Sequence, residues 1–474
     1  MEVEKRQDYI VMIESIIFLG SLLYFITHAS SLTFVESSRV GVAVLILDLC
    51  LFCIIQMKII TAQTIFLMLF IVFQFGLPVV YAFDPQHYSF YIELFSQEIL
   101  TNAVKYTVLA IQVYIITATI VVANRNRVEK KGEVSRWTKC IQTNASAVEE
   151  AALLLFAITA VVAVPVNIWS AVRALTAGEA IGNLYRGVMT ANALTRFFQE
   201  FFFSSALLFL CFSNKKDRKN VVTVMYVVVA ISMVMVADRS GGVTALVVYA
   251  LYYYYTGDEK FRKKNTIILI GAGIILVIVS ALVANIRTGV SSPSIIKLLV
   301  GALEEMGFNF TSLCFVMDYI PARSSYRLGL SYIVALALLI PKSLGLRSTY
   351  PKLQAYLGET WLWNANNLYG RDFLSFGVGF SLIAESYYNF SWGGIFAMIP
   401  LAGIITLFLR ERKNENQWSI YIRLVLMLSL FTAPRRQFLS VLKAIEYAIL
   451  FMSVYIVMYI KARGLLLRTR EKNK

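Results

Sequence analysis

The sequence predicts an all-α integral membrane protein with about twelve transmembrane helices, both termini in the cytoplasm, and one large structured outer loop between spans 9 and 10. Of its 474 residues, 58% are hydrophobic and only 15% are charged, and the mean hydropathy is +0.66. A soluble domain is about half apolar and about one quarter charged. Long apolar runs are separated by charged residues, and alternate loops are rich in Lys and Arg. Together these features exclude a disordered chain, collagen and a disulfide scaffold.

The transmembrane helices are predicted from apolar runs, each of which needs about 20 residues to cross the hydrocarbon core. The expected spans lie near 10–27, 40–56, 61–83, 103–123, 148–168, 193–213, 221–237, 243–256, 266–284, 384–409, 418–433 and 438–460. They divide the chain into spans 1–9 (1–284), a large outer loop (285–383), and spans 10–12 with a cytoplasmic tail (384–474).

The orientation follows from the basic residues. One set of alternate loops has 67 residues and 26 Lys or Arg, whereas the opposite set has 163 residues and only 14. The positive-inside rule therefore places both termini in the cytoplasm. The net charge of +15 is explained by topology, and no nucleic-acid partner is expected.

The two sides also use different basic residues. The inner loops contain 15 Lys and 11 Arg, and the outer loops contain 3 Lys and 11 Arg. Because Arg is a planar, bidentate donor for phosphate and carboxylate, the bias indicates anion recognition on the outer side. Ordinary ion pairs with outer-loop acids are the alternative explanation.

The outer loop of 99 residues is too long for a simple connection, so we expect it to carry structure and function. Ser294–Tyr319 is predicted to be an interfacial helix bearing Glu304 and Glu305. The apolar stretch Gly329–Ile340 is too short to span and is predicted to be re-entrant or interfacial. A cluster of aromatic and amide side chains follows, and it includes Trp361, Trp363 and Asn366.

Several function classes are disfavoured by what the sequence lacks. Two histidines and five scattered cysteines make no multi-His or disulfide site, so no metal is expected. No Walker, Rossmann or kinase motif is present, and no cofactor is expected. No internal repeat with matching halves is visible, which disfavours an inverted-repeat transporter.

Charged residues near the membrane are the first candidates for function. Asp48 lies within the second span, where a structural hydrogen-bonding role is an equal alternative. Arg239 lies in a Gly-flanked turn, Arg287 follows the ninth span, and Arg435 and Arg436 follow Pro434 on the outer side. Each arginine could also anchor a lipid phosphate.

The densest polar segment leads from the outer loop into the tenth span and reads Gly377-Val-Gly-Phe-Ser-Leu-Ile-Ala-Glu385-Ser-Tyr387-Tyr-Asn389-Phe-Ser-Trp-Gly-Gly394. Glu385 and Asn389 are four residues apart and share a helix face. A carboxylate, an amide and tyrosine hydroxyls at a membrane boundary suit a polyhydroxylated ligand. An aromatic belt with one interfacial acid is the simpler alternative.

This segment resembles the late motif of bacterial O-antigen and capsule repeat-unit polymerases (Wzy). The Asp238-Arg239-Ser240 turn, the large late outer loop and the Pro434-Arg435-Arg436 turn are similar to features of that family. Ser391-Trp392 departs from the Gly that the family often shows there. The resemblance concerns the C-terminal half; the N-terminal half agrees in hydropathy.

The resemblance implies a membrane glycosyltransferase without a cofactor, in the bacterial cytoplasmic (inner) membrane with its active site facing outside. Undecaprenyl-diphosphate-linked oligosaccharide would be both donor and acceptor, membrane lipid would surround the site, and a chain-length regulator and a flippase are candidate partners. The arginines would stabilise the leaving diphosphate. The expected catalytic residues are Glu385, Glu304 and Glu305; the expected diphosphate-binding residues are Arg239, Arg287, Arg435 and Arg436; the expected sugar-binding residues are Tyr387, Asn389, Trp361, Trp363 and Asn366.

Within this prediction Glu385 is the first choice for the base that accepts the acceptor hydroxyl's proton. Holding the anion site in shape is its alternative role. Two other functions remain open at the level of sequence. One is a flippase or other transporter for the same lipid-linked units, and the other is an O-antigen ligase-like transferase.

Overall fold

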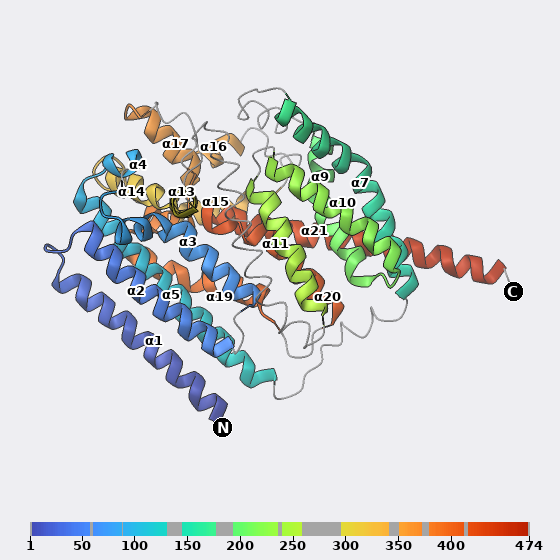
Figure 1. Ribbon diagram of the computed structural model, residues 1–474, viewed down its shortest axis with the longest axis horizontal. Coiled ribbons are helices and arrows are strands. Elements are labelled where there is room, and N and C mark those ends of the chain that lie inside the picture. The colour runs from blue at the N-terminus through green and yellow to red at the C-terminus, as the bar shows by residue number, and fades with distance from the viewer. Residues whose placement is uncertain are drawn as a thin grey trace. The chain divides into compact units, whose positions relative to one another are not determined.

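The computed structural model shows a helical protein in which every regular element of the described residues is a helix (Figure 1). The structure describes residues 2–56, 60–87, 89–129, 145–176, 193–235, 239–257, 295–340, 350–371, 379–411 and 416–472. The all-α prediction is confirmed for this part of the chain.

Eight stretches within these residues are long and apolar enough to cross a membrane. A ninth is gained if the bent pair Ile296–Gly307 and Phe310–Tyr319, which meet at 44°, forms one span. The eight are Arg6–Thr27, Phe34–Gln56, Ala62–Phe83, Gln97–Asn124, Val148–Arg173, Lys216–Met235, Leu382–Leu409 and Phe438–Ile460.

The predicted span near 266–284 lies outside the described residues. Helices also occupy three other predicted spans but are not among the eight: α9 covers Ala193–Phe212, of which Phe201–Phe212 is a short apolar stretch, α11 covers Arg239–Thr256, and α20 covers Gln417–Leu430. The twelve-span count, the cytoplasmic termini and the outer position of 285–383 therefore stay predictions.

The chain forms two compact units. The first consists of Met1–Gly132, Pro293–Glu411 and Ala433–Lys443, and the second of Glu133–Ser292, Arg412–Thr432 and Ala444–Lys474. Helix α21 (Phe438–Lys472) contributes to both. Each unit thus combines segments that are distant in sequence, whereas the predicted three-part division followed chain order.

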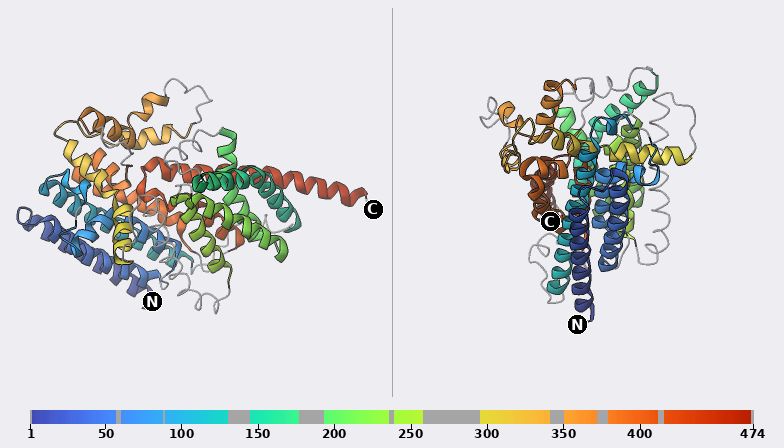
Figure 2. Two further views of the ribbon diagram at one scale, coloured as in Figure 1. Left: turned by 45° about the horizontal axis from the view of Figure 1, so that its top comes forward. Right: turned by 90° about the vertical axis from the view of Figure 1, so that its left-hand side faces the viewer.

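The long helices of the first unit pack side by side, with α2 against α3 and α5, and α19 against α5 (Figures 1 and 2). Shorter helices from the predicted outer loop lie on them. The elements are α1 (Glu2–Thr27), α2 (Phe34–Gln56), α3 (Ala62–Phe83), α4 (Phe90–Glu93), α5 (Gln97–Glu129), α13 (Ile295–Gly307), α14 (Phe310–Tyr319), α15 (Leu330–Ala337), α16 (Tyr350–Gln354), α17 (Gly358–Leu368), α18 (Leu382–Phe390), η2 (Ser391–Ala397), α19 (Met398–Leu409) and η3 (Ala433–Arg435).

The predicted interfacial helix 294–319 is divided into α13 and α14. Gly307 ends α13 where the backbone of α3 comes very close: a Cβ on Gly307 would lie 2.1 Å from the Leu77 nitrogen and 2.7 Å from the Gly76 Cα. Two glycines thus allow backbone-to-backbone contact between α13 and α3. The chain then bends and restarts as α14, so the break has a packing cause.

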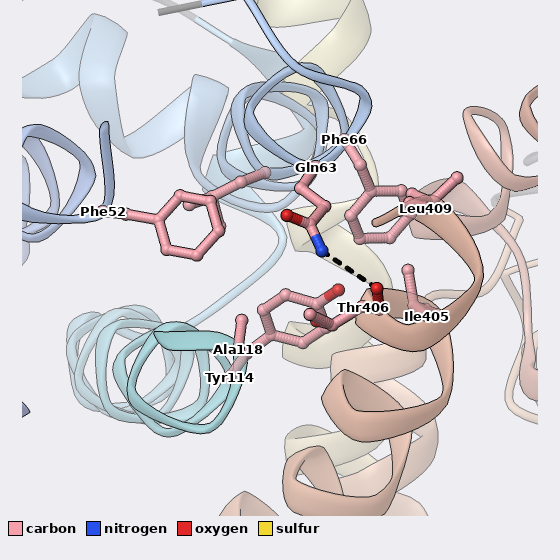
Figure 3. A pocket seen from close by; sticks show the side chains of 9 residues that line it. Phe52, Gln63, Phe66, Tyr114, Ala118, Ile405, Thr406 and Leu409 are labelled. Carbon is pink, nitrogen blue, oxygen red and sulfur yellow. Dashed lines mark hydrogen bonds between the residues drawn. The ribbon is translucent and has the colours of Figure 1, made fainter. Parts of the chain in front are cut away.

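A narrow cavity lies among α2, α3, α5 and α19 (Figure 3). Its walls are mostly apolar, and the Gln63 amide donates to the Thr406 carbonyl oxygen at 2.9 Å across one side. This bond satisfies both groups at membrane depth, where an unpaired amide would be costly. Its lining residues are Phe52, Gln63, Phe66, Leu67, Tyr114, Ala118, Ile405, Thr406 and Leu409.

The second unit contains α7 (Ala145–Thr176), α9 (Ala193–Phe212), α10 (Lys216–Met235), α11, α20 and most of α21. Its tyrosines join the helices by hydrogen bonds. Tyr226 donates to the Ala245 carbonyl at 2.9 Å, and Tyr252 donates to the Leu210 carbonyl at 2.8 Å. The Tyr-rich sequence of α11 therefore serves helix packing.

Candidate functional site

The late motif forms helix α18, which is almost entirely enclosed. Ser381 caps its start by accepting a hydrogen bond from the Ala384 amide at 3.0 Å. Leu382 to Asn389 are all buried. After Phe390 the chain turns at Ser391, whose φ is +54°, and continues through η2 into α19. The motif therefore lies inside the first unit and exposes little surface to a ligand.

Glu385 is fully buried, and both of its carboxylate oxygens accept hydrogen bonds from the protein. Ser331 Oγ donates to Oε1 at 2.7 Å, and the backbone N–H of Phe438 donates to Oε2. Phe438 is the first residue of α21, so the carboxylate also meets the positive end of that helix. Glu385 thus joins α15, α18 and the start of α21.

Asn389 continues the same buried network. Its amide nitrogen donates to Ser331 Oγ and to the Glu385 carbonyl, both at 2.8 Å, and its amide oxygen accepts from Gly329 N at 3.0 Å. Gly329 and Leu328 both have positive φ, of +87° and +49°. The Asn389 amide oxygen therefore holds this tight turn, and both of its amide hydrogens are used within the protein, which leaves none for a sugar.

The double-arginine turn, defined here as residues 433–437, presents two exposed guanidinium side chains on a fixed backbone. The Gln74 amide of α3 donates to the Pro434 carbonyl. The Gln437 side-chain oxygen accepts from Glu359 N at 3.3 Å, and Glu385 binds the following residue. Arg435 also lies over the Phe73 ring, 5.6 Å from its centroid. Three side-chain hydrogen bonds and one cation–π contact thus fix the turn, while both arginines stay exposed.

Asn309, in the bend between α13 and α14, lies near this turn. A Cβ on Gly379 would lie 3.4 Å from the Asn309 side-chain oxygen and 4.0 Å from the Arg435 carbonyl oxygen, so Asn309 and Arg435 flank the same glycine. Gly379 has a φ of +73°, a conformation that favours glycine. Glu304 and Glu305 lie in the last turn of α13, shortly before the bend that contains Asn309.

The two acids of α13 differ in their surroundings. Glu304 is partly buried, and its Oε2 lies 3.1 Å from His87 Nε2. His87 Nδ1 is also 4.0 Å from Asp84. Glu305 is exposed. Of the three predicted catalytic carboxylates, these two are the more accessible.

The predicted sugar-binding aromatics are divided between core and surface. Trp361 is 8% exposed and packs on Tyr388 with ring centroids 4.8 Å apart, whereas Trp363 is 43% exposed. The Asn366 amide oxygen accepts from the Tyr319 hydroxyl at 2.7 Å. Tyr387 is buried and meets the Tyr326 hydroxyl at 3.4 Å. Trp363 is the most accessible member of this predicted group.

The structure does not bring all four predicted arginines together. Arg239 is the first residue of α11 in the second unit, a helix start where a turn was predicted, and its side chain lies outside the described part of the chain. Arg287 also lies outside the described residues. Arg435 and Arg436 are adjacent and exposed in the first unit.

Several functional candidates were missed at the level of sequence. Gln74 and Ser331 support the turn and Glu385, but no local pattern marks them. Arg323 is exposed and lies 4.9 Å from the Tyr369 ring centroid, while Arg327 Nε donates to the Tyr388 hydroxyl at 3.0 Å. The arginine bias of the outer loops was the signal that could have identified them.

A protein-family model described as O-antigen polysaccharide polymerase Wzy matches residues 9–463, nearly the whole chain. No curated protein and no solved structure matches the chain. The match confirms the resemblance and extends it from the late motif to the N-terminal half. The chain is a multi-pass helical membrane protein that belongs to the O-antigen polysaccharide polymerase Wzy family.

Proposed function

We propose that this protein joins undecaprenyl-diphosphate-linked oligosaccharide units at the outer face of the bacterial cytoplasmic membrane, and that the double-arginine turn binds the diphosphate of the donor. The bond between the anomeric carbon of the growing chain and the diphosphate oxygen breaks, and the diphosphate leaves with the electron pair. A hydroxyl of the incoming lipid-linked unit forms the new glycosidic bond and loses its proton to a base. Family membership supports the polymerase function; the substrate and the side of the membrane are part of the proposal.

The observation that carries this proposal is the geometry of residues 433–437. Two adjacent guanidinium groups are exposed, yet their backbone is held by Gln74, Glu385 and the contact between Gln437 and Glu359 N. Cationic donors that are fixed before the reaction stabilise developing charge without reorganisation. Arg suits a leaving diphosphate better than Lys because its planar fork binds two oxygens at once.

We assign different roles to the three carboxylates. Glu385 has both oxygens occupied inside the protein, so we propose that it positions the double-arginine turn. Glu304 and Glu305 lie on α13, which ends two residues before Asn309, and they are the proposed bases for the acceptor hydroxyl. His87, which contacts Glu304 at 3.1 Å, would orient that carboxylate.

Sugar rings need apolar faces and hydrogen-bonding edges. The exposed Trp363 offers such a face, whereas Tyr387 is buried. Trp361, Asn366 and Asn389 support this region from within. Membrane lipid surrounds the site in this proposal, and a chain-length regulator and a flippase would act beside it.

The test uses the full chain in proteoliposomes supplied with purified lipid-linked units. We expect Arg435→Lys and Arg436→Lys to lower the rate of polymer formation about ten- to a hundredfold, because the charge stays while the bidentate fork is lost. The control is Arg218→Lys, an exposed arginine of α10. Full activity of both turn variants would show that the turn serves topology or lipid anchoring.

The same assay separates the alternatives. A polymerase produces a ladder of longer chains on the lipid carrier. A flippase moves single units across the bilayer without lengthening them, and a ligase-like transferase requires a different acceptor. No ladder from wild-type protein with pure lipid-linked units would contradict the proposed reaction.

A further inference from the structure

Two acidic side chains lie buried together among the long helices of the first unit, away from the double-arginine turn. Glu14 belongs to α1 and Asp48 to α2, and both are essentially inaccessible. Asp48 is close enough to Glu14 for their negative charges to repel. Intramembrane acids are expensive and usually functional. The polymerase mechanism proposed above uses neither of them.

Helix α5 supplies polar partners to both acids. Thr119 donates its hydroxyl hydrogen to Glu14 Oε1 at 3.0 Å, and the Gln112 amide donates to Asp48 Oδ2 at 3.1 Å. Gln112 is only 1% exposed and its side chain is directed at Asp48. The cluster therefore joins α1, α2 and α5, which pack against one another.

The donors in this cluster are too few for its acceptors. Glu14 Oε2, Asp48 Oδ1 and the Gln112 side-chain oxygen are all buried and have no hydrogen-bond partner among the described residues. An unpaired buried acceptor costs about 1–3 kcal/mol, and more if it is charged. Three such acceptors in one place need a bound proton or another cation, because the described groups around them supply no further hydrogen-bond donor.

The two acids also share one depth. Glu14 follows Arg6, where its candidate span begins, by eight residues, and Asp48 precedes Gln56, where α2 ends, by eight. Because α1 and α2 form a hairpin, a rise of about 1.5 Å per residue places both about 12 Å from the same end. The two blue helices run alongside each other in Figures 1 and 2.

Two other titratable side chains of α5 are engaged elsewhere. Lys105 of α5 donates to the Ala29 carbonyl at 3.0 Å, and Tyr106 bonds Ser386 at 2.7 Å. Among the described residues, the hydrogen-bond partners of the two acids are Thr119 and Gln112, and the charge of Asp48 also acts on Glu14. Among the side chains that the structure describes on the packed helices, the other titratable groups are Arg6, Asp8, Tyr9 and Tyr24 on α1, Glu36, Arg39, Cys50 and Cys53 on α2, Tyr81 on α3, Glu98 and Tyr114 on α5, and Cys314, Asp318 and Tyr319 on α14.

We propose that Glu14 and Asp48 form a proton-binding site within the membrane, in which the two carboxyl groups together hold at least one proton at neutral pH. The bound proton turns a repelling pair into a donor and an acceptor, and it supplies a hydrogen bond that the cluster lacks. Loss of the proton would leave two negative charges facing each other in a low-dielectric region. The site therefore links the packing of α1 and α2 on α5 to protonation.

Infrared spectroscopy of the full chain in lipid nanodiscs tests this directly, because a protonated carboxylic acid has a C=O stretching band separate from those of carboxylates and amides. We expect such a band in the wild type at neutral pH, a small shift of the band in heavy water, and its loss in the double variant Glu14→Gln plus Asp48→Asn. Glu98→Gln, which removes an exposed acid of α5, is the control and should leave the band unchanged.

The stability of the variants gives a second measurement. Amide side chains match neutral carboxylic acids in shape, so the double variant should fold with nearly the wild-type unfolding temperature. An unchanged band in the double variant, or failure of that variant to fold, would overturn the proposal. So would a band that sodium chloride removes and choline chloride does not, since sodium would then occupy the site.

Discussion

The role of Glu385 can be decided by comparing two substitutions. In Glu385→Gln the amide oxygen can still accept the Phe438 N–H, and the amide nitrogen can donate to Ser331 Oγ, so the link to the double-arginine turn is kept. In Glu385→Ala both partners lose it. We therefore expect the Gln variant to retain much more polymer formation than the Ala variant, because both hydrogen bonds are kept in neutral form instead of being lost.

The expected loss for Glu385→Ala follows from its two hydrogen bonds. Each buried donor left without a partner costs about 1–3 kcal/mol, and about 1.4 kcal/mol changes an equilibrium tenfold. If this cost falls on the arrangement of the turn that binds the diphosphate, the rate drops at least about tenfold. Gln74→Ala removes another support of the same backbone and contains no acid, so it should have a similar effect.

The assay is the initial rate of chain elongation in proteoliposomes, measured across pH and normalised to protein abundance. If Glu385 only positions the turn, the elongation rate of Glu385→Gln should depend on pH in the same way as that of the wild type. A Gln variant as inactive as the Ala variant, at normal abundance, would refute the positioning role. Glu385 would then be the base, as first predicted from the sequence.

Three further predictions concern other parts of the first unit. A cysteine at the exposed Lys352 in a cysteine-free background should be labelled from outside intact spheroplasts, and labelling only after permeabilisation would overturn the predicted topology. Gly307→Ala should lower the unfolding temperature measurably and reduce abundance, because its Cβ would lie 2.1 Å from the Leu77 nitrogen; wild-type stability would contradict the close helix contact. Trp363→Ala should raise the KM for lipid-linked units while protein abundance stays normal. Trp361→Ala should lower the stability of the protein by about 3–5 kcal/mol. The reverse pattern would contradict the assignment of Trp363 to the surface and Trp361 to the core.

Much of the fold could be predicted because transmembrane helices are specified locally. Apolar length and flanking charge marked α1, α2 and α3 to within a few residues at most of their ends. The break between α13 and α14 could not be predicted in this way. It depends on contact of Gly307 with Gly76, far away in the sequence, and no local pattern encodes such a contact.

In the candidate site, too, the locally specified features could be predicted and the contacts between distant segments could not. The exposed arginines were found because Arg435 and Arg436 run against the charge trend of their predicted side. The i,i+4 spacing of Glu385 and Asn389 correctly placed them together on one helix. Their partners Ser331 and Gln74 come from other helices, and a serine or a glutamine in an apolar stretch carries no signal of what it will bind. The sequence thus indicated which segment matters and left its role undetermined.

The burial of the late motif offers a physical reason for its composition. An exposed cationic turn at a membrane boundary would move freely if only its own residues held it, and ordering it upon binding would cost affinity. A carboxylate inside the protein can hold the start of α21 without pairing with the exposed arginines in place of the diphosphate. Its two oxygens already accept hydrogen bonds from Phe438 N and Ser331 Oγ. Asn389 in turn fixes Ser331. A buried acid and amide behind exposed arginines are therefore what a preorganised diphosphate site requires.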